Sequence, residues 1–318
     1  MPKPPHRPQV YINKIFRGSN AIERGVLTRD DLRSSAWRPL FRDVYADARL
    51  GPGHKIRCIA VSRFVMPAGS AIAGRSAAYL YGVAFIADDH PVEVLAPQVF
   101  GPVKGVSIHT GQLPDADLLV KGGLAVTRPL RTCWDLARWL DPVEAVVFID
   151  ALAACGLVSR VSLAKYARER QGSRGHAKFV KIVDLVDPRA ESPQESRLRV
   201  RLVLAGLPKP VAQFVIERGG VFLARVDLAF PELMIAIEYD GRWHASAEQL
   251  ERDRKRLNKL LGADWVVFHV TADQMRRHFD DLVRELREVV RRRSRPRPPS
   301  YFGEVGASNE KDRPTSPK

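Results

Sequence analysis

The chain has 318 residues, 45% of them hydrophobic, so it is long enough for two or three domains and is not a single small domain. Its 51 Lys and Arg against 36 Asp and Glu give a formal net charge of +15, which favours a polyanionic partner such as nucleic acid. A merely well-solvated basic surface is the alternative.

The cysteines and the N-terminal residues bear on the cellular compartment. Cys58, Cys133 and Cys155 are far apart and show no C-x-x-C spacing, so we expect core residues of a reduced protein and no cysteine zinc site. The first residues, "MPKPPHRPQVYINK", contain no apolar signal core, and no apolar run approaches the length of a membrane span. We therefore expect a soluble, cytoplasmic protein without a membrane partner.

Residues 1–70 predict a winged-helix-like region. The segment "SNAIERGVLTRDDLRSSAW" predicts two short helices, the second with Thr28 as N-cap and Asp31 in a capping-box position. A strand, "FRDVYADA", follows. No basic recognition helix of normal length fits between Trp37 and Phe41, so direct base reading by this region is not expected.

Residues 71–187 predict an α/β segment followed by helices. A helix, "GRSAAYLYGV", precedes strands "PVEVLA" and "GVSIHT". Three amphipathic helices come next, the second begun by Asp141 and Pro142 in N-cap and N1 positions. Six basic residues and one acid lie between Arg160 and Lys178. Such a run is typical of a solvated helix face, although it could also hold phosphates.

A boundary is expected near "VDPRAESPQ", and residues 188–290 predict an α/β domain of order αβββαβα. Its elements are expected as helix 193–205, strands 211–217, 223–229 and 234–240, helix 246–261, strand 265–269 and helix 272–289. The remaining residues, 291–318, are rich in proline and charge and are expected to be a disordered basic tail.

Three carboxylates interrupt the apolar strands of this domain. Strand side chains alternate between faces, so Glu238 and Asp240 share one face, opposite Ile237. Asp227 lies on the preceding strand. Crowded carboxylates repel one another, and burying them unpaired is costly. A metal ion between them is therefore the expected counter-charge.

The order of elements, with an Asp on the second strand and Glu-x-Asp on the third, resembles the PD-(D/E)XK nuclease fold. The segments "SPQESRLRVRLVLAGLPKPVAQ", "ARVDLAFPELMIAIEYDGRWH" and "RDRKRLNKLLGADWVVFHVTADQ" are similar to very-short-patch-repair-like endonuclease domains of unknown function. Residues 10–180 resemble the N-terminal region of AbiEi-type antitoxins in "LFRDVYADA", "GRSAAYLYGV" and "TRPLRTCWDLAR". The resemblance implies a C-terminal restriction-endonuclease-like domain preceded by winged-helix-like and α/β regions.

The resemblance also implies the roles of the acids. Asp227 and Glu238 would be the principal ligands of Mg²⁺ or Mn²⁺, since hard oxygen donors suit these ions and carboxylate-held metals support phosphodiester hydrolysis. Asp240 would be a third ligand or would orient a water molecule. Glu195, on the preceding helix, would complete the acidic cluster.

One departure from the family pattern concerns proton transfer, because Asp240 stands where the signature has lysine. The resemblance implies that His244 could take over that role. Arg242 could instead contact the scissile phosphate, since arginine is a poor base. The cysteine zinc site of the repair enzymes is absent from the sequence, so mismatch specificity is not carried over.

Most of these residues also have a structural interpretation. Glu195 could complete a capping box with Ser192, Asp227 could pair with Arg225, and His244 could be a hydrogen-bonding residue without catalytic function. On the helix predicted at 246–261, three cations share one face that could follow a phosphate backbone: Arg252, Arg256 and Lys259.

We therefore expect a metal-dependent DNA endonuclease whose N-terminal region binds DNA or a protein partner. A non-catalytic DNA-binding regulator of the antitoxin kind is the second hypothesis. A structural or interaction protein with basic surfaces is the third, and the three clustered acids argue against it.

Overall fold

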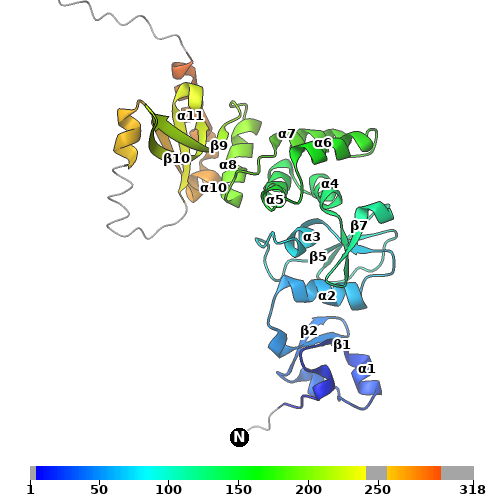
Figure 1. The fold of residues 1–318 in the computed structure, drawn as a ribbon. Helices are drawn as coiled ribbons and strands as arrows, with labels where there is room; N and C mark the ends of the chain where they lie inside the picture. Colours follow the sequence, from blue (N-terminus) through cyan, green and yellow to red (C-terminus); the bar gives the residue numbers. More distant parts are fainter. Residues whose placement is uncertain (1–4, 241–255, 295–318) are drawn as a thin grey trace, which may run out of the picture.

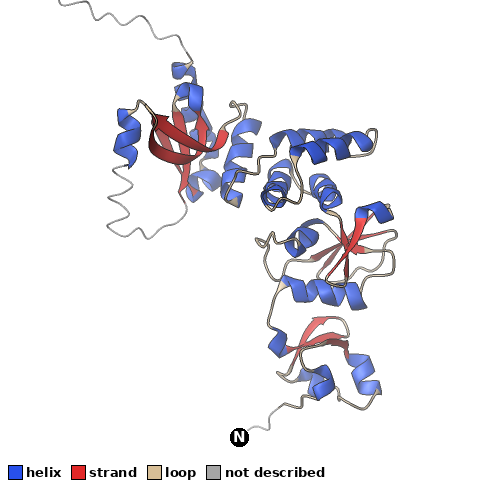
Figure 2. Ribbon diagram, in the orientation of Figure 1, coloured by secondary structure: helices blue, strands red, loops and turns tan. Residues whose placement is uncertain are grey.

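The structure, a computed structural model, describes residues 5–240 and 256–294. The mixed α/β class predicted from the sequence is confirmed, with helices arranged around three sheets in the described residues. In Figure 1 the units follow one another along the chain, and the C-terminal unit lies to one side of the helical layer, so that the molecule is L-shaped. Figure 2 shows one sheet in each of the N-terminal, middle and C-terminal parts.

The N-terminal unit is built on a small antiparallel sheet of order β1-β3-β2. Thr28 and Asp31 make the predicted reciprocal cap, at 2.8 and 3.1 Å, but the second predicted helix is reduced to a three-residue 3-10 helix. Its elements are η1 (Gln9–Tyr11), β1 (Ile15–Arg17), α1 (Gly18–Glu23), η2 (Asp31–Arg33), β2 (Trp37–Phe41), β3 (Val44–Asp47) and η3 (Ala48–Leu50).

The middle unit is a five-stranded mixed sheet of order β6-β5-β4-β8-β7. Buried residues of α2, α3 and the strands share one hydrophobic core, because each element presents an apolar face to the sheet. Its elements are α2 (His54–Phe64), β4 (Ala71–Ile72), α3 (Gly74–Leu80), β5 (Val92–Ala96), β6 (Val106–Thr110), η4 (Asp115–Asp117), β7 (Leu118–Lys121) and β8 (Leu124–Thr127).

A helical layer joins this unit to the C-terminal one. Asp141 caps α5 as predicted, since its Oδ1 accepts the backbone N–H groups of Val143 and Glu144 at 3.0 and 3.1 Å. Cys58 and Cys133 are buried as expected, but Cys155, just after α5, is exposed, so its prediction as a core residue is wrong. The helices are α4 (Pro129–Trp139), α5 (Pro142–Ala154), α6 (Arg160–Glu169) and α7 (His176–Leu185).

The C-terminal unit contains a four-stranded sheet of order β12-β11-β10-β9. Neighbours in β9, β10 and β11 are antiparallel, whereas β12 is parallel to β11. The elements are α8 (Pro193–Leu204), β9 (Val211–Arg218), β10 (Val221–Phe230), η5 (Pro231–Leu233), β11 (Ile235–Asp240), β12 (Val266–Thr271), α10 (Ala272–Arg277) and α11 (Phe279–Arg293). Residues 256–262 are also helical.

Two predictions for this unit need correction. The single helix expected at 272–289 is two helices, because the backbone at His278 leaves the helical region between α10 and α11. The helix α11 then extends to Arg293, supported by the buried Leu286 and Val289, so the first residues of the predicted tail are helical. Residues 295–318 lie outside the described part of the chain.

The helix α8 belongs to two cores at once. Val200 packs in the core of the helical layer, whereas Leu198 and Leu202 pack beneath the C-terminal sheet. Between them Arg199 is fully buried and donates to Asp150 Oδ2 on α5 at 2.6 Å. No helix in the described part of the chain is both long and apolar enough to cross a lipid bilayer.

Candidate active site

Asp227 lies where β10 and β11 separate. The pairing of the two strands runs from Phe230 with Ile235 to Leu228 with Ile237. One residue further, Asp227 Oδ2 accepts the backbone N–H of Tyr239 at 2.8 Å. The Asp227 carboxylate thus accepts a backbone N–H that a carbonyl of a neighbouring strand would otherwise accept. This contact holds Asp227 beside β11.

Glu238 lies on the sheet face opposite the core that contains Ile235 and Ile237. It is buried, with 6% of its surface exposed. Its Oε2 accepts a hydrogen bond from Arg256 of the helical segment 256–262, while its Oε1 is buried and has no hydrogen-bond partner among the described residues. Glu238 is therefore only partly neutralised by its neighbours.

The electrostatics link the two acids. Burial raises the pKa of Glu238, opposed by Arg256 and His269, while the charges of Asp227 and Asp240 raise it further. Burial likewise raises the pKa of Asp227, and the Tyr239 amide opposes this. Carboxylates perturbed by burial and by each other are typical of functional sites, because an isolated structural acid gains nothing from such crowding.

A histidine that was not among the predicted site residues lies beside these acids. His269 on β12 is the parallel partner of Glu238, and its Nδ1 lies 3.3 Å from Asp240 Oδ2 and 3.7 Å from Glu238 Oε2. The sequence signal was a histidine at the end of the strand predicted at 265–269. Its significance depends on the parallel register between β11 and β12, which the sequence does not specify.

Glu195 reaches the same site from α8. Its Oε2 accepts the Gln213 side-chain N–H at 2.8 Å and the Glu191 backbone N–H at 3.0 Å, and its own backbone N–H donates to Ser192 Oγ at 3.2 Å. Its charge contributes to the raised pKa of Asp227. Glu195 therefore both stabilises the start of α8 and adds negative charge beside Asp227.

The residues predicted to bind phosphate differ from one another in their surroundings. Arg256 contacts Glu238 instead of forming an open basic face, while Lys259 is exposed. The alternative pairing of Asp227 with Arg225 is not formed, since Arg225 pairs with Glu191 at 3.0 Å. Three predicted residues lie outside the described part of the chain: Arg242, His244 and Arg252.

The donor set fits a divalent cation in its chemistry. Asp227 and Glu238 offer the hard oxygens that Mg²⁺ prefers, and the Oε1 atom of Glu238 is buried without a hydrogen-bond partner in the described residues. Within residues 5–240 and 256–294, however, no three His, Cys, Asp or Glu side chains are gathered closely enough to hold a metal ion. Arg256 and His269 instead supply the positive and polar groups that face the acids.

Comparison with known proteins gives two relatives in Mycobacterium tuberculosis. They are "Uncharacterized protein Rv2248" of strain ATCC 25618 / H37Rv and "Uncharacterized protein MT2308" of strain CDC 1551 / Oshkosh, each 32% identical over 188 residues. The match covers 58% of this chain and 69% of each relative. No protein-family model matches the chain, and no solved structure does. At this identity and coverage, the chain belongs to the same family as these two mycobacterial proteins.

Proposed function

We propose that the chain is a metal-dependent DNA endonuclease whose C-terminal unit has a restriction-endonuclease-like fold. The observation that carries the proposal is the pair of partly or fully buried acids on the two central strands, Asp227 and Glu238, whose pKa values are raised by burial and by nearby negative charge. The arrangement of the unit supports it: helix, three antiparallel strands and a fourth strand parallel to the third. The net charge of +15 suits a polyanionic substrate.

In this proposal Asp227 and Glu238 would hold Mg²⁺ or Mn²⁺. When bound, the metal would stabilise charge on the phosphoryl oxygens and lower the pKa of a water molecule. Arg256 would move from Glu238 to a phosphate oxygen as substrate enters, because a guanidinium binds either anion well. Glu195 would hold Gln213 and, through it, the local path of β9.

His269 is the residue within the described site that we assign to proton transfer in place of the missing signature lysine. Its Nδ1 already faces Asp240 and Glu238, and an imidazole within reach of the reacting groups can serve as a general acid or base. His244 remains the other proposed candidate.

The second candidate is a non-catalytic DNA-binding regulator of the antitoxin kind. The observation that favours it is the contact between Arg256 and Glu238. A permanent ion pair there would neutralise the principal acid without a metal, as in a domain that has lost activity.

Cleavage assays separate the two candidates. Purified protein is incubated with supercoiled, linear and single-stranded DNA, with Mg²⁺, Mn²⁺ or neither. Glu238→Gln should abolish cleavage and leave DNA binding intact, whereas Glu217→Gln, an exposed acid on β9, should cleave like wild type. His269→Ala should slow cleavage by about 10² to 10⁴, the usual range for a lost general acid or base.

Binding without metal-dependent cleavage of any DNA form would favour the regulator. Equal cleavage by wild type and the Glu238→Gln variant would remove the acids from the mechanism. Circular dichroism of each variant checks that a loss of activity is not a loss of fold.

A further inference from the structure

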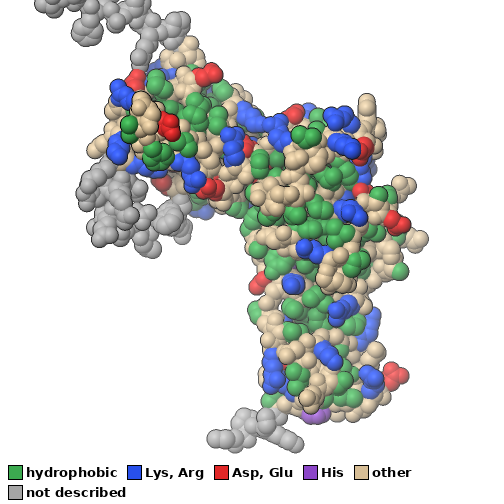
Figure 3. All heavy atoms as spheres, viewed as in Figure 1, with side chains coloured by type: hydrophobic (Ala, Val, Ile, Leu, Met, Phe, Trp, Pro, Cys, Tyr) green, Lys and Arg blue, Asp and Glu red, His purple; other side chains and the backbone are tan. Residues whose placement is uncertain are grey.

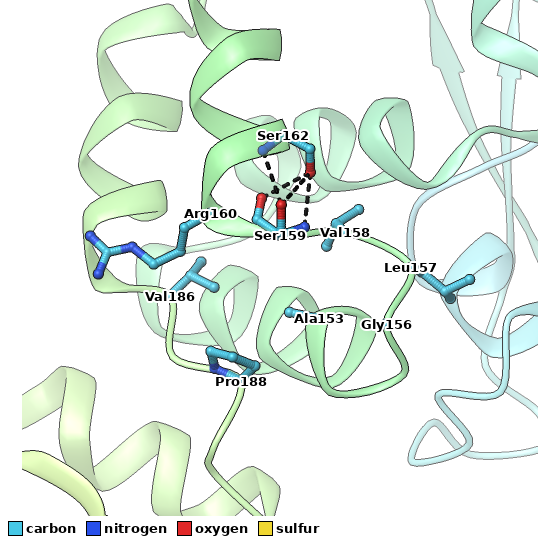
Figure 4. A pocket seen from close by; sticks show the side chains of 9 residues that line it. All are labelled: Ala153, Gly156, Leu157, Val158, Ser159, Arg160, Ser162, Val186 and Pro188. Carbon is cyan, nitrogen blue, oxygen red and sulfur yellow. Dashed lines mark hydrogen bonds between the residues drawn. The ribbon is translucent and has the colours of Figure 1, made fainter.

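A second site lies away from the acidic cluster, where the helical layer meets the C-terminal unit. Two neighbouring clefts, of 620 and 460 Å³, share Arg160, Val186 and Pro188 in their walls. The first lies between the end of α5 and the start of α6 (Figure 4). The second is bounded by the segment before β9, including Lys209. Together the clefts form one groove across the junction.

The walls of the groove carry more positive than negative charge. The Asp187 carboxylate already pairs with Arg189, whose Nε and Nη2 donate to its two oxygens at 2.9 and 2.7 Å. Lys209 donates to the backbone carbonyl of Asp184 at 2.6 Å, which leaves its charge without a carboxylate partner. Arg160 forms no ion pair with any described residue. Neither cation therefore forms a direct ion pair with a carboxylate of the described residues, although the charges of Asp187 and Asp184 act on Lys209 from further away.

These two cations also oppose each other. Burial lowers the pKa of the Lys209 ammonium, and the neighbouring charges of Arg160 and Arg199 lower it further, while those of Asp187 and Asp184 oppose the shift. An anion bound between Arg160 and Lys209 would relieve this repulsion. Figure 4 shows the Arg160 guanidinium extending away from Ser159 and Ser162, whose side chains are engaged in the helix cap at 3.1 and 2.8 Å.

We propose that Arg160 and Lys209 bind the phosphodiester backbone of DNA at a site separate from the acidic cluster. The choice of DNA over another phosphate compound rests on the proposed function. Lys209 is four residues before Gln213, whose side chain donates to Glu195, so at most about 14 Å of extended chain separates the Cα atoms of these two residues. Duplex DNA rises 3.4 Å per phosphate on each strand, so this length corresponds to about four base steps, well within one short duplex.

The surface around the groove agrees with this path. Figure 3 shows Lys and Arg side chains gathered where the C-terminal unit meets the helical layer. Backbone phosphates attract such cations without reading sequence. The site would therefore fix the position of the DNA and add affinity, while leaving base recognition to other parts of the chain.

The test measures DNA binding without divalent metal, so that it does not depend on catalysis. The variant Arg160→Gln/Lys209→Gln is compared with wild type and with Lys104→Gln, an exposed lysine of the middle unit. Fluorescence anisotropy of a labelled 20-base-pair duplex is recorded from 0.05 to 0.3 M salt. Losing two phosphate contacts should reduce the salt slope by about 2 and weaken binding about 60-fold at 0.1 M salt. Lys104→Gln should have little effect.

Three outcomes would overturn the proposal. The first is that wild type does not bind DNA, and the second is that the double variant and Lys104→Gln lose DNA affinity equally. The third is that the double variant keeps its DNA affinity but no longer binds inorganic phosphate, measured by calorimetry. The last would identify a site for free phosphate. A large, selective loss in the double variant supports the site even if wild type cleaves no DNA, so failure of the endonuclease proposal is recognised separately. Circular dichroism checks the fold of each variant.

Discussion

Replacing Arg256 by glutamine tests whether this residue competes with a metal ion for Glu238. In the structure Arg256 donates to Glu238 Oε2, so its positive charge offsets the carboxylate charge that would attract a cation to this site. Removing the guanidinium leaves the buried acid without its main counter-charge. If Asp227 and Glu238 hold Mg²⁺, Arg256→Gln should therefore bind the ion more tightly than wild type, in the absence of DNA.

The expected gain follows from the exposure of the pair. Exposed ion pairs contribute about 0.2–1 kcal/mol, whereas breaking a buried pair costs about 3–5 kcal/mol. The Glu238 side chain is 8% exposed and that of Arg256 is 36% exposed, so solvent screens one partner and we take about 1–2 kcal/mol. Since 1.4 kcal/mol is about tenfold in affinity, the Mg²⁺ dissociation constant should fall by roughly 5- to 30-fold.

The assay is calorimetric titration with Mg²⁺ or Mn²⁺ at pH 8, well above the ordinary pKa values of both acids. Lys259→Gln is the matched control, because it removes the same charge from the same helical segment at an exposed position and should change metal affinity only slightly. An Arg256→Gln variant that binds metal no better than Lys259→Gln would refute the competition. The same variant should bind DNA less well, since it has lost a cation near the phosphates.

Three further predictions concern stability, pH and reactivity. Asp150→Ala should lower the free energy of unfolding in urea by about 3–5 kcal/mol, because it leaves the Arg199 charge buried and unpaired. Glu144→Ala, which removes one partner of a partly exposed ion pair with Arg197, should cost less than about 1 kcal/mol; equal losses would contradict this account. Burial raises the pKa values of the two acids of the sheet, Asp227 and Glu238, above their ordinary 3.8 and 4.5. Without metal, the contribution of these acids to folding stability should therefore fall as pH rises through that range and beyond. The increase in the thermal unfolding midpoint caused by Mg²⁺ should appear only as the acids ionise. An increase of the same size at pH 4 and pH 8 would be inconsistent with Mg²⁺ binding to Asp227 and Glu238. A thiol reagent should modify one cysteine quickly, the exposed Cys155, and the two buried ones only on unfolding.

Local patterns predicted most of the C-terminal unit. Helix 193–205 and strand 211–217 agree with α8 and β9 within one residue at each end, because a Ser-Pro start and alternating apolar residues determine such elements locally. The expected proximity of Asp227 and Glu238 also follows from strand alternation and from a short connection between two strands. Their interaction in the structure depends only on these local rules.

The rest depends on pairings that are distant in sequence. His269 is near Glu238 because β12 is parallel to β11, and many registers would satisfy the same apolar pattern. Arg256 was expected to face phosphate because its helix was considered alone, without the sheet that lies against it. The short strand β4 was missed for a similar reason, since two residues show no periodicity.

The double role of α8 has a consequence for how this unit can pass between proteins. A C-terminal unit separated near residue 188 would carry Arg199 and Val200 on an open helix face, with the Asp150 carboxylate left behind on α5. Recombination that attached the unit to a different N-terminal part would preserve the packing only if the incoming helix offered an acid and an apolar groove at the same places. Free-standing versions of the unit should therefore have replaced the arginine, and fused versions should have inherited the adjoining helix together with it.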